Sequence, residues 1–185
     1  SAVKRPDVIG KKKEPICSVG YKYMFNACRI PKLGADTCRI YNPHMHRHAI
    51  VACRGHFFEI PSEDVHGLPL NRFELEDLLY ECESKAAIKD PAFLELGWLT
   101  TWNRDDWAKA RDFLLEPGGS DMANAFERLE SALFVINLDV DTVATSLQDQ
   151  ALNFWHGGLA EGMNRWWDKP LQLAVTRNGK WAYLG

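Results

Sequence analysis

The chain has 185 residues, which is enough for one hydrophobic core and too few for two full-sized domains. Its composition, 46% hydrophobic, 25% charged and 11% aromatic, is typical of a soluble globular protein. The net charge of −3 provides no overall positive field for nucleic acid or an anionic membrane. No apolar run reaches the roughly 18 residues of a membrane span.

The first residues are polar and basic. Residues 1–14 are predicted to form a flexible basic arm, with its densest charge at residues 11–13. They contain no signal peptide and no Arg-rich presequence, so the chain itself carries no targeting signal. The five cysteines are odd in number, irregularly spaced and without a C-x-x-C pair. This pattern favours reduced thiols in a reducing compartment over a disulfide framework or a zinc ribbon.

The next predicted elements are a helix, a connector and a hairpin. Apolar residues before Pro31 recur at helical spacing, which predicts a helix of two or three turns. These residues are Tyr21, Met24, Phe25 and Cys28. Residues 32–42 are rich in turn formers and are predicted to be a connector. Short apolar runs at residues 49–53 and 57–60 lie on either side of Gly55, which predicts a hairpin.

Two capped helices and a strand follow. Asn71 and Glu74 form a capping-box pattern, which predicts a helix that extends to about Ser84. The segment GWLTTW is predicted to be a short strand. Asn103 is predicted to cap a further helix that ends at the Pro-Gly-Gly of residues 117–119.

The last part of the chain predicts a helix, a buried strand, another helix and a hairpin. Ser120 begins a helical pattern that leads into a continuous apolar strand at residues 133–138. The polar residues 141–153 are interpreted as a helix. LQLAVTR and KWAYLG alternate around Asn178-Gly179, the strongest signal for a two-residue hairpin turn. The mixed order of elements predicts an α/β or α+β fold with helices packed on a mixed sheet.

Two histidine motifs are candidates for chemistry. His44, His46 and His48 have period-two spacing, which would place them on one face of a strand as metal ligands. However, neighbours on one face do not converge, and no acidic residue in the stretch can orient the imidazoles, so a solvated strand entrance is favoured. His156, followed by two glycines, fits an oxyanion loop only weakly. The residues alone leave catalysis undetermined.

Arg165 and Asp168 flank two tryptophans in the motif NRWWDK. An arginine ordered among indoles requires a fixed anionic partner, because burying an unpaired guanidinium costs several kcal/mol. The motif therefore predicts a structural ion pair that anchors the strand beginning at Lys169, rather than a direct catalytic role.

Several blocks of the chain resemble the carnitine/choline acyltransferase family. NRWWDKPLQLAVTRNGKWAYLG is similar to the segment that leads into the catalytic histidine of that family. In the same order, PICSVGYKYMFNACRIPKLGADT, HAIVACRGHFFEI, GWLTTWNRDDWAKARDFLL and the His-Gly-Gly element resemble further family blocks. The resemblance extends from about residue 15 to residue 185.

The resemblance implies a two-domain CoA-dependent acyltransferase fold, of which residues 15–185 would be part of the N-terminal domain. The implied activity is reversible acyl transfer between CoA and the hydroxyl of carnitine, most similar to a carnitine O-acetyltransferase. A choline or longer-chain relative, or a binding domain that keeps the fold, is the alternative. CoA would be a co-substrate rather than a tightly bound cofactor, and the remainder of the polypeptide would be a partner. Localisation by resemblance is mitochondrial or peroxisomal.

In the family, the general base belongs to a Glu-His pair directly after the strand that KWAYLG represents. The chain ends at Gly185, so the resemblance places the base beyond it, and the isolated chain is expected to be inactive. His156 matches the His-Gly-Gly element and not the base. Arg165 and Asp168 are carried over as supporting residues. No catalytic, cofactor-binding or metal-binding residue is assigned within the chain.

Overall fold

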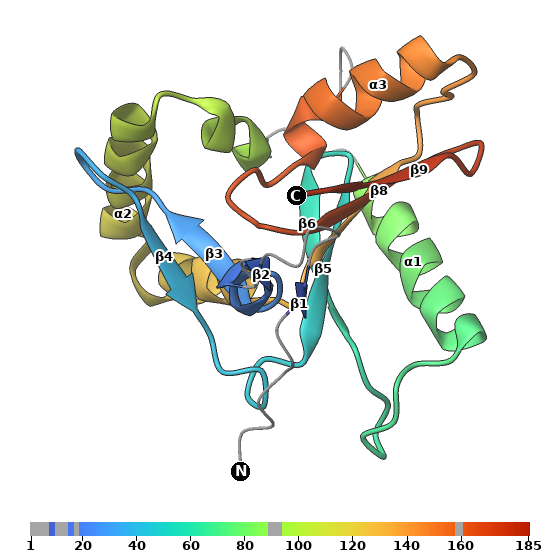
Figure 1. Cartoon of the computed structure of the whole chain (residues 1–185), viewed down its shortest axis with the longest axis horizontal. Helices are drawn as coiled ribbons and strands as arrows, with labels where there is room; N and C mark the ends of the chain where they lie inside the picture. The colour runs from blue at the N-terminus through green and yellow to red at the C-terminus, as the bar shows by residue number, and fades with distance from the viewer. Residues whose placement is uncertain (1–7, 10–14, 17–18, 89–93, 158–160) are drawn as a thin grey trace.

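A five-stranded mixed sheet lies at the centre of the computed structural model (Figure 1). Its strand order is β6-β5-β7-β8-β9, with antiparallel hairpins at both edges and parallel pairing of β5, β7 and β8. The described residues are 8–9, 15–16, 19–88, 94–157 and 161–185. The strands are β5 (His48–Cys53), β6 (His56–Pro61), β7 (Val135–Asp139), β8 (Gln172–Thr176) and β9 (Trp181–Leu184). The predicted mixed sheet with packed helices is confirmed.

Three α-helices cover the two faces of this sheet: α1 (Arg72–Ala86), α2 (Arg104–Ser131) and α3 (Leu147–His156). Helix α1 packs on the face that presents Val51 and Ile136. Helices α2 and α3 cover the opposite face, where α2 contacts Val135 and α3 contacts Ala174. The described residues contain no helix that is both long and apolar enough to cross a membrane.

Both predicted hairpins of the sheet are confirmed. The β5–β6 turn contains Gly55 at φ 78°, and the β8–β9 turn contains Gly179 at φ 74°. Asn178 also bonds outside its turn, because its Nδ2 donates to the carbonyl of Ala144 at 2.8 Å. This bond ties the hairpin to the segment between β7 and α3. The helix predicted over residues 141–153 begins later than expected, at Leu147.

The capped helices are confirmed, with one change. Asn71 and Glu74 form the complete capping box of α1. Asn103 Oδ1 accepts from the amide of Asp105 at 3.0 Å and caps α2. The predicted end of that helix is a break rather than a terminus, because Gly119 has the left-handed angles φ 51° and ψ −139°. The break divides α2 into a first arm (104–118) and a second arm (120–131), and Figure 1 shows that the helix does not run straight.

The helix predicted before Pro31 is wrong. Only η1 (Val19–Tyr23) is helical there, a single short 3₁₀ segment, and Cys28 lies in strand β3 (Ala27–Ile30). Asn26 adopts φ 50°, which ends helical geometry, and its side-chain amide donates to the carbonyl of Ser131 at 2.9 Å. The connector predicted over residues 32–42 contains strand β4 (Thr37–Ile40), the antiparallel partner of β3.

The strand predicted for GWLTTW is also wrong, because this segment forms the 3₁₀ helix η2 (Leu96–Thr101). The hydroxyls of Thr100 and Thr101 donate to carbonyls three residues earlier, at 2.8 and 2.7 Å, and these bonds favour helical turns over strand. Gly97 lies so close to the backbone of Met163 that a β-carbon at position 97 would be 2.1 Å from the Met163 carbonyl oxygen.

The N-terminal region is described only in part. Strand β1 (Val8–Ile9), which falls within the predicted basic arm, pairs with β2 (Pro15–Ile16). Residues 11–13 and Cys17 lie outside the described residues. The four described cysteines are free thiols. They are Cys28, Cys38, Cys53 and Cys82.

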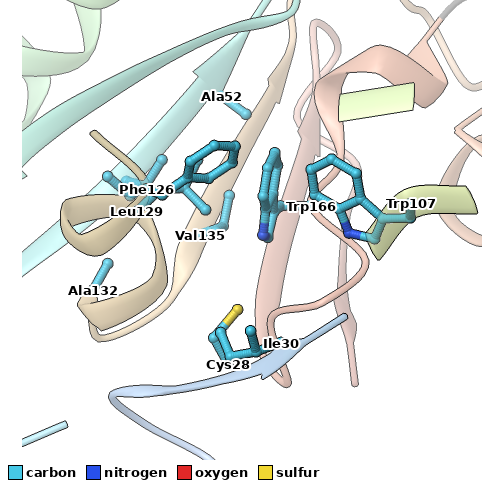
Figure 2. Packing of buried hydrophobic residues seen from close by; sticks show 10 residues of the cluster. Cys28, Ile30, Ala52, Trp107, Phe126, Leu129, Ala132, Val135 and Trp166 are labelled. Atoms are coloured by element: carbon cyan, nitrogen blue, oxygen red, sulfur yellow. The ribbon is translucent and has the colours of Figure 1, made fainter. Parts of the chain in front are cut away.

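An aromatic cluster around Trp166 fills the core between the sheet and α2 (Figure 2). The Trp166 ring meets Phe57 of β6 at a centroid distance of 5.5 Å and Trp107 of the first arm at 5.9 Å, both edge to face. Phe126 of the second arm lies 6.2 Å from the same ring. Both arms of α2 therefore pack against the NRWWDK motif.

Candidate functional site

The NRWWDK motif begins at Asn164, the last residue of η3 (Glu161–Asn164), and leads towards strand β8. Its two predicted support residues are both buried, Arg165 with 0% and Asp168 with 3% of its surface exposed. They do not pair with each other. Each belongs to a separate polar network, and the partners of each come from other parts of the chain.

Arg165 forms a fully buried bidentate ion pair with Asp139, the last residue of β7. Nη1 and Nη2 of Arg165 donate to the two carboxylate oxygens, both at 2.7 Å, and both side chains are 0% exposed. Each carboxylate oxygen also accepts one amide hydrogen bond, from Asn153 of α3 at 2.8 Å and from Asn164 at 3.1 Å. The predicted ion pair therefore joins the motif to β7 and α3. Buried charges are tolerated when they are paired and hydrogen-bonded, and here only Nε of the guanidinium has no hydrogen-bond partner.

Asp168 accepts hydrogen bonds from Arg29 and Trp107 and forms an ion pair with Arg104. Its Oδ1 atom lies 3.0 Å from Nε of Arg29 and 2.8 Å from Nη2 of Arg104. Its Oδ2 atom accepts from the indole N–H of Trp107 at 2.8 Å. Asp36 closes the cluster, because its Oδ2 lies 2.7 Å from Nε of Arg104 and 3.5 Å from Nε of Arg29. Two carboxylates thus alternate with two guanidinium groups.

Lys169 is 4% exposed and faces the end of α2. Its ammonium group donates to the carbonyls of Glu130 at 2.9 Å and Ala132 at 2.5 Å. Burial disfavours the charged form and lowers the pKa of Lys169 to about 8. Burial also raises the pKa of the nearby Cys28 thiol well above its ordinary value. Burial and the raised pKa both favour the protonated thiol of Cys28 over a thiolate nucleophile.

A cavity of about 370 Å³ lies where β9 ends. It is lined by residues of β3, of the NRWWDK motif and of the chain end. These include Arg29, Asp168, Lys169, Gln172, Leu184 and Gly185. Gly185 packs closely on the motif, because a β-carbon there would lie 2.7 Å from the carbonyl oxygen of Pro170. The position of this loop therefore determines where Gly185, the residue that follows β9, lies.

A larger cavity of about 680 Å³ lies between the β5–β6 hairpin and the second arm of α2. Its wall combines aromatic side chains, such as Phe57 and Trp166, with charged ones, such as Glu59, Asp121 and Arg128. The smaller cavity is the better candidate site despite its size, because buried charged groups converge there. Buried charged groups in a cleft are typical of functional sites.

The histidine motifs do not assemble a site. His48 begins β5, whereas His44 lies in a turn at residues 43–45 and His46 lies between that turn and the strand, so the three do not share one strand face. The His48 ring is bonded instead to the carbonyl of Arg128 at 2.7 Å. Among the described residues, no three His, Cys, Asp or Glu side chains are grouped to hold a metal ion. His156 ends α3, and Gly157 caps that helix in the left-handed conformation.

Sequence patterns did not identify the partners of the motif. Asp139 ends the largely apolar strand β7, and the carboxyl ends of parallel strands are the position of many functional side chains. Arg104 and Trp107 are spaced i, i+3 in the first turns of α2, so both face the same neighbour. These signals were present in the sequence, but neither specifies what the side chains contact.

The sequence of the chain is similar to those of known acyltransferases. A model of the choline/carnitine O-acyltransferase family matches residues 3–185. The chain is 29% identical over 174 residues to the mitochondrial carnitine O-acetyltransferase of Saccharomyces cerevisiae, covering 92% of this chain and 25% of that protein. It is 32% identical over 172 residues to the choline O-acetyltransferase of Danio rerio, covering 89% and 26%. It is also 32% identical over 176 residues to a highly reducing polyketide synthase of Aspergillus luteorubrus, covering 95% and 5%.

Proposed function

The chain belongs to the choline/carnitine O-acyltransferase family, and on this premise we propose that it is part of an enzyme that transfers acyl groups between CoA and carnitine. The chain spans about a quarter of the length of its carnitine and choline acetyltransferase relatives. The proposal therefore concerns the polypeptide that carries this chain. CoA enters as a co-substrate, and no tightly bound cofactor is proposed.

The observation that carries the proposal is the arrangement at the end of β9. This strand ends beside a cavity, and the loop beneath Gly185 is fixed by buried charges. A group that follows Gly185 would thus be held in a defined position. Enzymes need such support, because a displacement of about 1 Å at a reacting group can cost on the order of 100-fold in rate.

The proposed mechanism uses a histidine after Gly185 as general base. Its imidazole takes the hydroxyl proton of carnitine as the alcohol oxygen attacks the thioester carbonyl of acyl-CoA. When the tetrahedral intermediate collapses, the carbon–sulfur bond breaks and the imidazolium returns the proton to the CoA sulfur. An imidazole suits both directions because its unperturbed pKa of about 6.5 is near neutral pH. Arg165 and Asp168 hold β8 and β9 in place and do not touch the reacting atoms.

Choline is the alternative acceptor, because the zebrafish relative, named a choline O-acetyltransferase, is as similar to the chain as the yeast carnitine enzyme. Two alternatives remain: an enzyme that transfers longer acyl chains, and a binding domain without catalysis. An acetyl donor and a mitochondrial or peroxisomal location are proposed for the carnitine enzyme. The mitochondrial yeast relative supports the location.

The test measures thiol release from acetyl-CoA by the polypeptide that carries this chain. Release should depend on added L-carnitine, exceed that with choline, and disappear when the histidine after Gly185 is replaced by Ala. The isolated 185-residue chain should match the blank. Acceptor-independent thiol release, or full activity of the isolated chain, would refute the proposal. Binding of acetyl-CoA without turnover would support the binding domain instead.

A further inference from the structure

The first arm of α2 holds Asp168. Trp107 Nε1 donates to Oδ2 of Asp168 at 2.8 Å, and Arg104 Nη2 lies 2.8 Å from Oδ1. Trp107 is 0% exposed, and its ring packs edge to face on Trp166. Both the carboxylate and the backbone next to it are therefore fixed by one end of a helix that starts more than 60 residues earlier in the chain.

The second arm of α2 holds the neighbouring residue, Lys169. Its ammonium group donates to the carbonyls of Glu130 and Ala132 at the end of the helix. The Glu130 carbonyl belongs to the last turn and Ala132 is the residue that follows the helix, so no amide within the helix reaches these carbonyls, and the helix dipole there favours a positive charge. Lys169 thus caps the second arm, and the two arms of one helix hold two adjacent residues.

The break at Gly119 makes this arrangement possible. A straight helix of 28 residues would be about 42 Å long, so its two ends could not both reach neighbouring residues, whose Cα atoms lie about 3.8 Å apart. The left-handed φ of 51° at Gly119 turns the second arm back towards the first. Glycine reaches this conformation without the steric strain of a side chain.

The held dipeptide is continuous with the end of β9. Pro170 follows Lys169, and its carbonyl oxygen is the atom against which Gly185 packs. Two residues further on, Gln172 pairs with Leu184 in the β8–β9 register. A shift of residues 168–170 would therefore move the end of β9 and any residue attached to it.

We infer that the two arms of α2 form a clamp on Asp168 and Lys169, and that Arg104, Trp107 and Lys169 are positioning residues for the group that follows Gly185. The inference rests on the proposed function for its catalytic consequence. Its structural content, the placement of the end of β9 by both ends of a broken helix, is independent of that function.

Trp107→Phe tests the clamp, because it removes the hydrogen bond to Asp168 and keeps an aromatic ring in the cluster, although the smaller ring also loses some packing against Phe126 and Trp166. In a polypeptide that carries this chain and transfers acyl groups, kcat should fall at least tenfold, with KM for acetyl-CoA and for the acceptor changed less than twofold. Amide hydrogen exchange should become at least tenfold faster in β9 and stay unchanged in β5 and β7. Trp155→Phe, at an indole that is 75% exposed, is the matched control and should change neither kcat nor the exchange rates in β9.

Arg104 provides a second comparison. Arg104→Lys keeps a cation beside Asp168 and should retain more turnover and more protection of β9 than Arg104→Met. A kcat within twofold of the unsubstituted protein, or exchange that accelerates equally in β5, β7 and β9, would overturn the clamp and leave only a general structural role. If the unsubstituted polypeptide transfers no acyl group, the proposed function fails, and the exchange data still decide the clamp.

Discussion

Replacing Arg165 by Met should strongly destabilise the chain, because it leaves the Asp139 carboxylate buried without its cation. Both side chains are 0% exposed, so water cannot replace the two lost N–H donors. The hydrogen bonds from Asn153 and Asn164 remain, but they are neutral donors. Breaking a buried ion pair from one side costs roughly 3 to 5 kcal/mol.

A surface ion pair of the same geometry provides the control. Arg54 also makes a bidentate contact, with Nε and Nη2 at 2.7 and 2.9 Å from the carboxylate of Asp141. Its side chain is 28% exposed and that of Asp141 is 58% exposed, so solvent screens the charges. Arg54→Met should therefore cost about 1 kcal/mol or less. The comparison isolates burial as the cause of the larger effect.

The assay is equilibrium urea unfolding followed by tryptophan fluorescence and circular dichroism. For a chain of this size, the loss expected for Arg165→Met corresponds to a fall in Tm of roughly 6 to 20 °C. The double variant Asp139→Leu with Arg165→Met should recover most of the stability, because no unpaired charge remains. A loss below about 1 kcal/mol for the single variant, or a double variant no more stable than the single one, would refute the reasoning.

Three further predictions concern other buried or terminal groups. Burial lowers the pKa of Lys169 from 10.5 to about 8, so between these pH values the unfolded chain binds a proton that the folded chain does not. The unfolding free energy of the unsubstituted chain, measured relative to that of Lys169→Met, should therefore rise by about 3 kcal/mol from pH 8 to 10.5. Urea titrations in which the two proteins show parallel pH profiles would exclude this. Gly97→Ala should cost about 1 to 3 kcal/mol by the same titration, because backbone must shift, whereas Gly20→Ala, with open space, should be neutral. Asn71→Ala should remove the cap of α1 and cost about 1 kcal/mol, and an unchanged urea midpoint would argue against the cap.

Local patterns predicted the elements whose determinants lie within a few residues of each other. The turn at Asn178-Gly179 and the cap at Asn71 are of this kind, and both are confirmed. The helix predicted before Pro31 is wrong because helical spacing was overridden by distant contacts. Asn26 bonds to a carbonyl 105 residues away, and Cys28 of β3 pairs with Arg39 of β4, a strand within the predicted connector.

The candidate site was predicted only in part. The family resemblance predicted Arg165 and Asp168 as supporting residues with buried polar contacts; both are buried, and their supporting role stays a prediction. The partner of Arg165 lies 26 residues away, and two partners of Asp168 lie 61 and 139 residues away. No pattern in the sequence relates such positions to one another.

The sequence by itself therefore determined the class of fold, the hairpins, the capped helices and the family. Only the tertiary structure decided which charges pair. The chain contains several carboxylates that could pair with each arginine, and only the arrangement of the strands places one of them next to it. The break at Gly119 is the clearest case. In the sequence its Pro-Gly-Gly context predicted the end of a helix, whereas in the fold it bends one helix so that both ends reach Asp168 and Lys169.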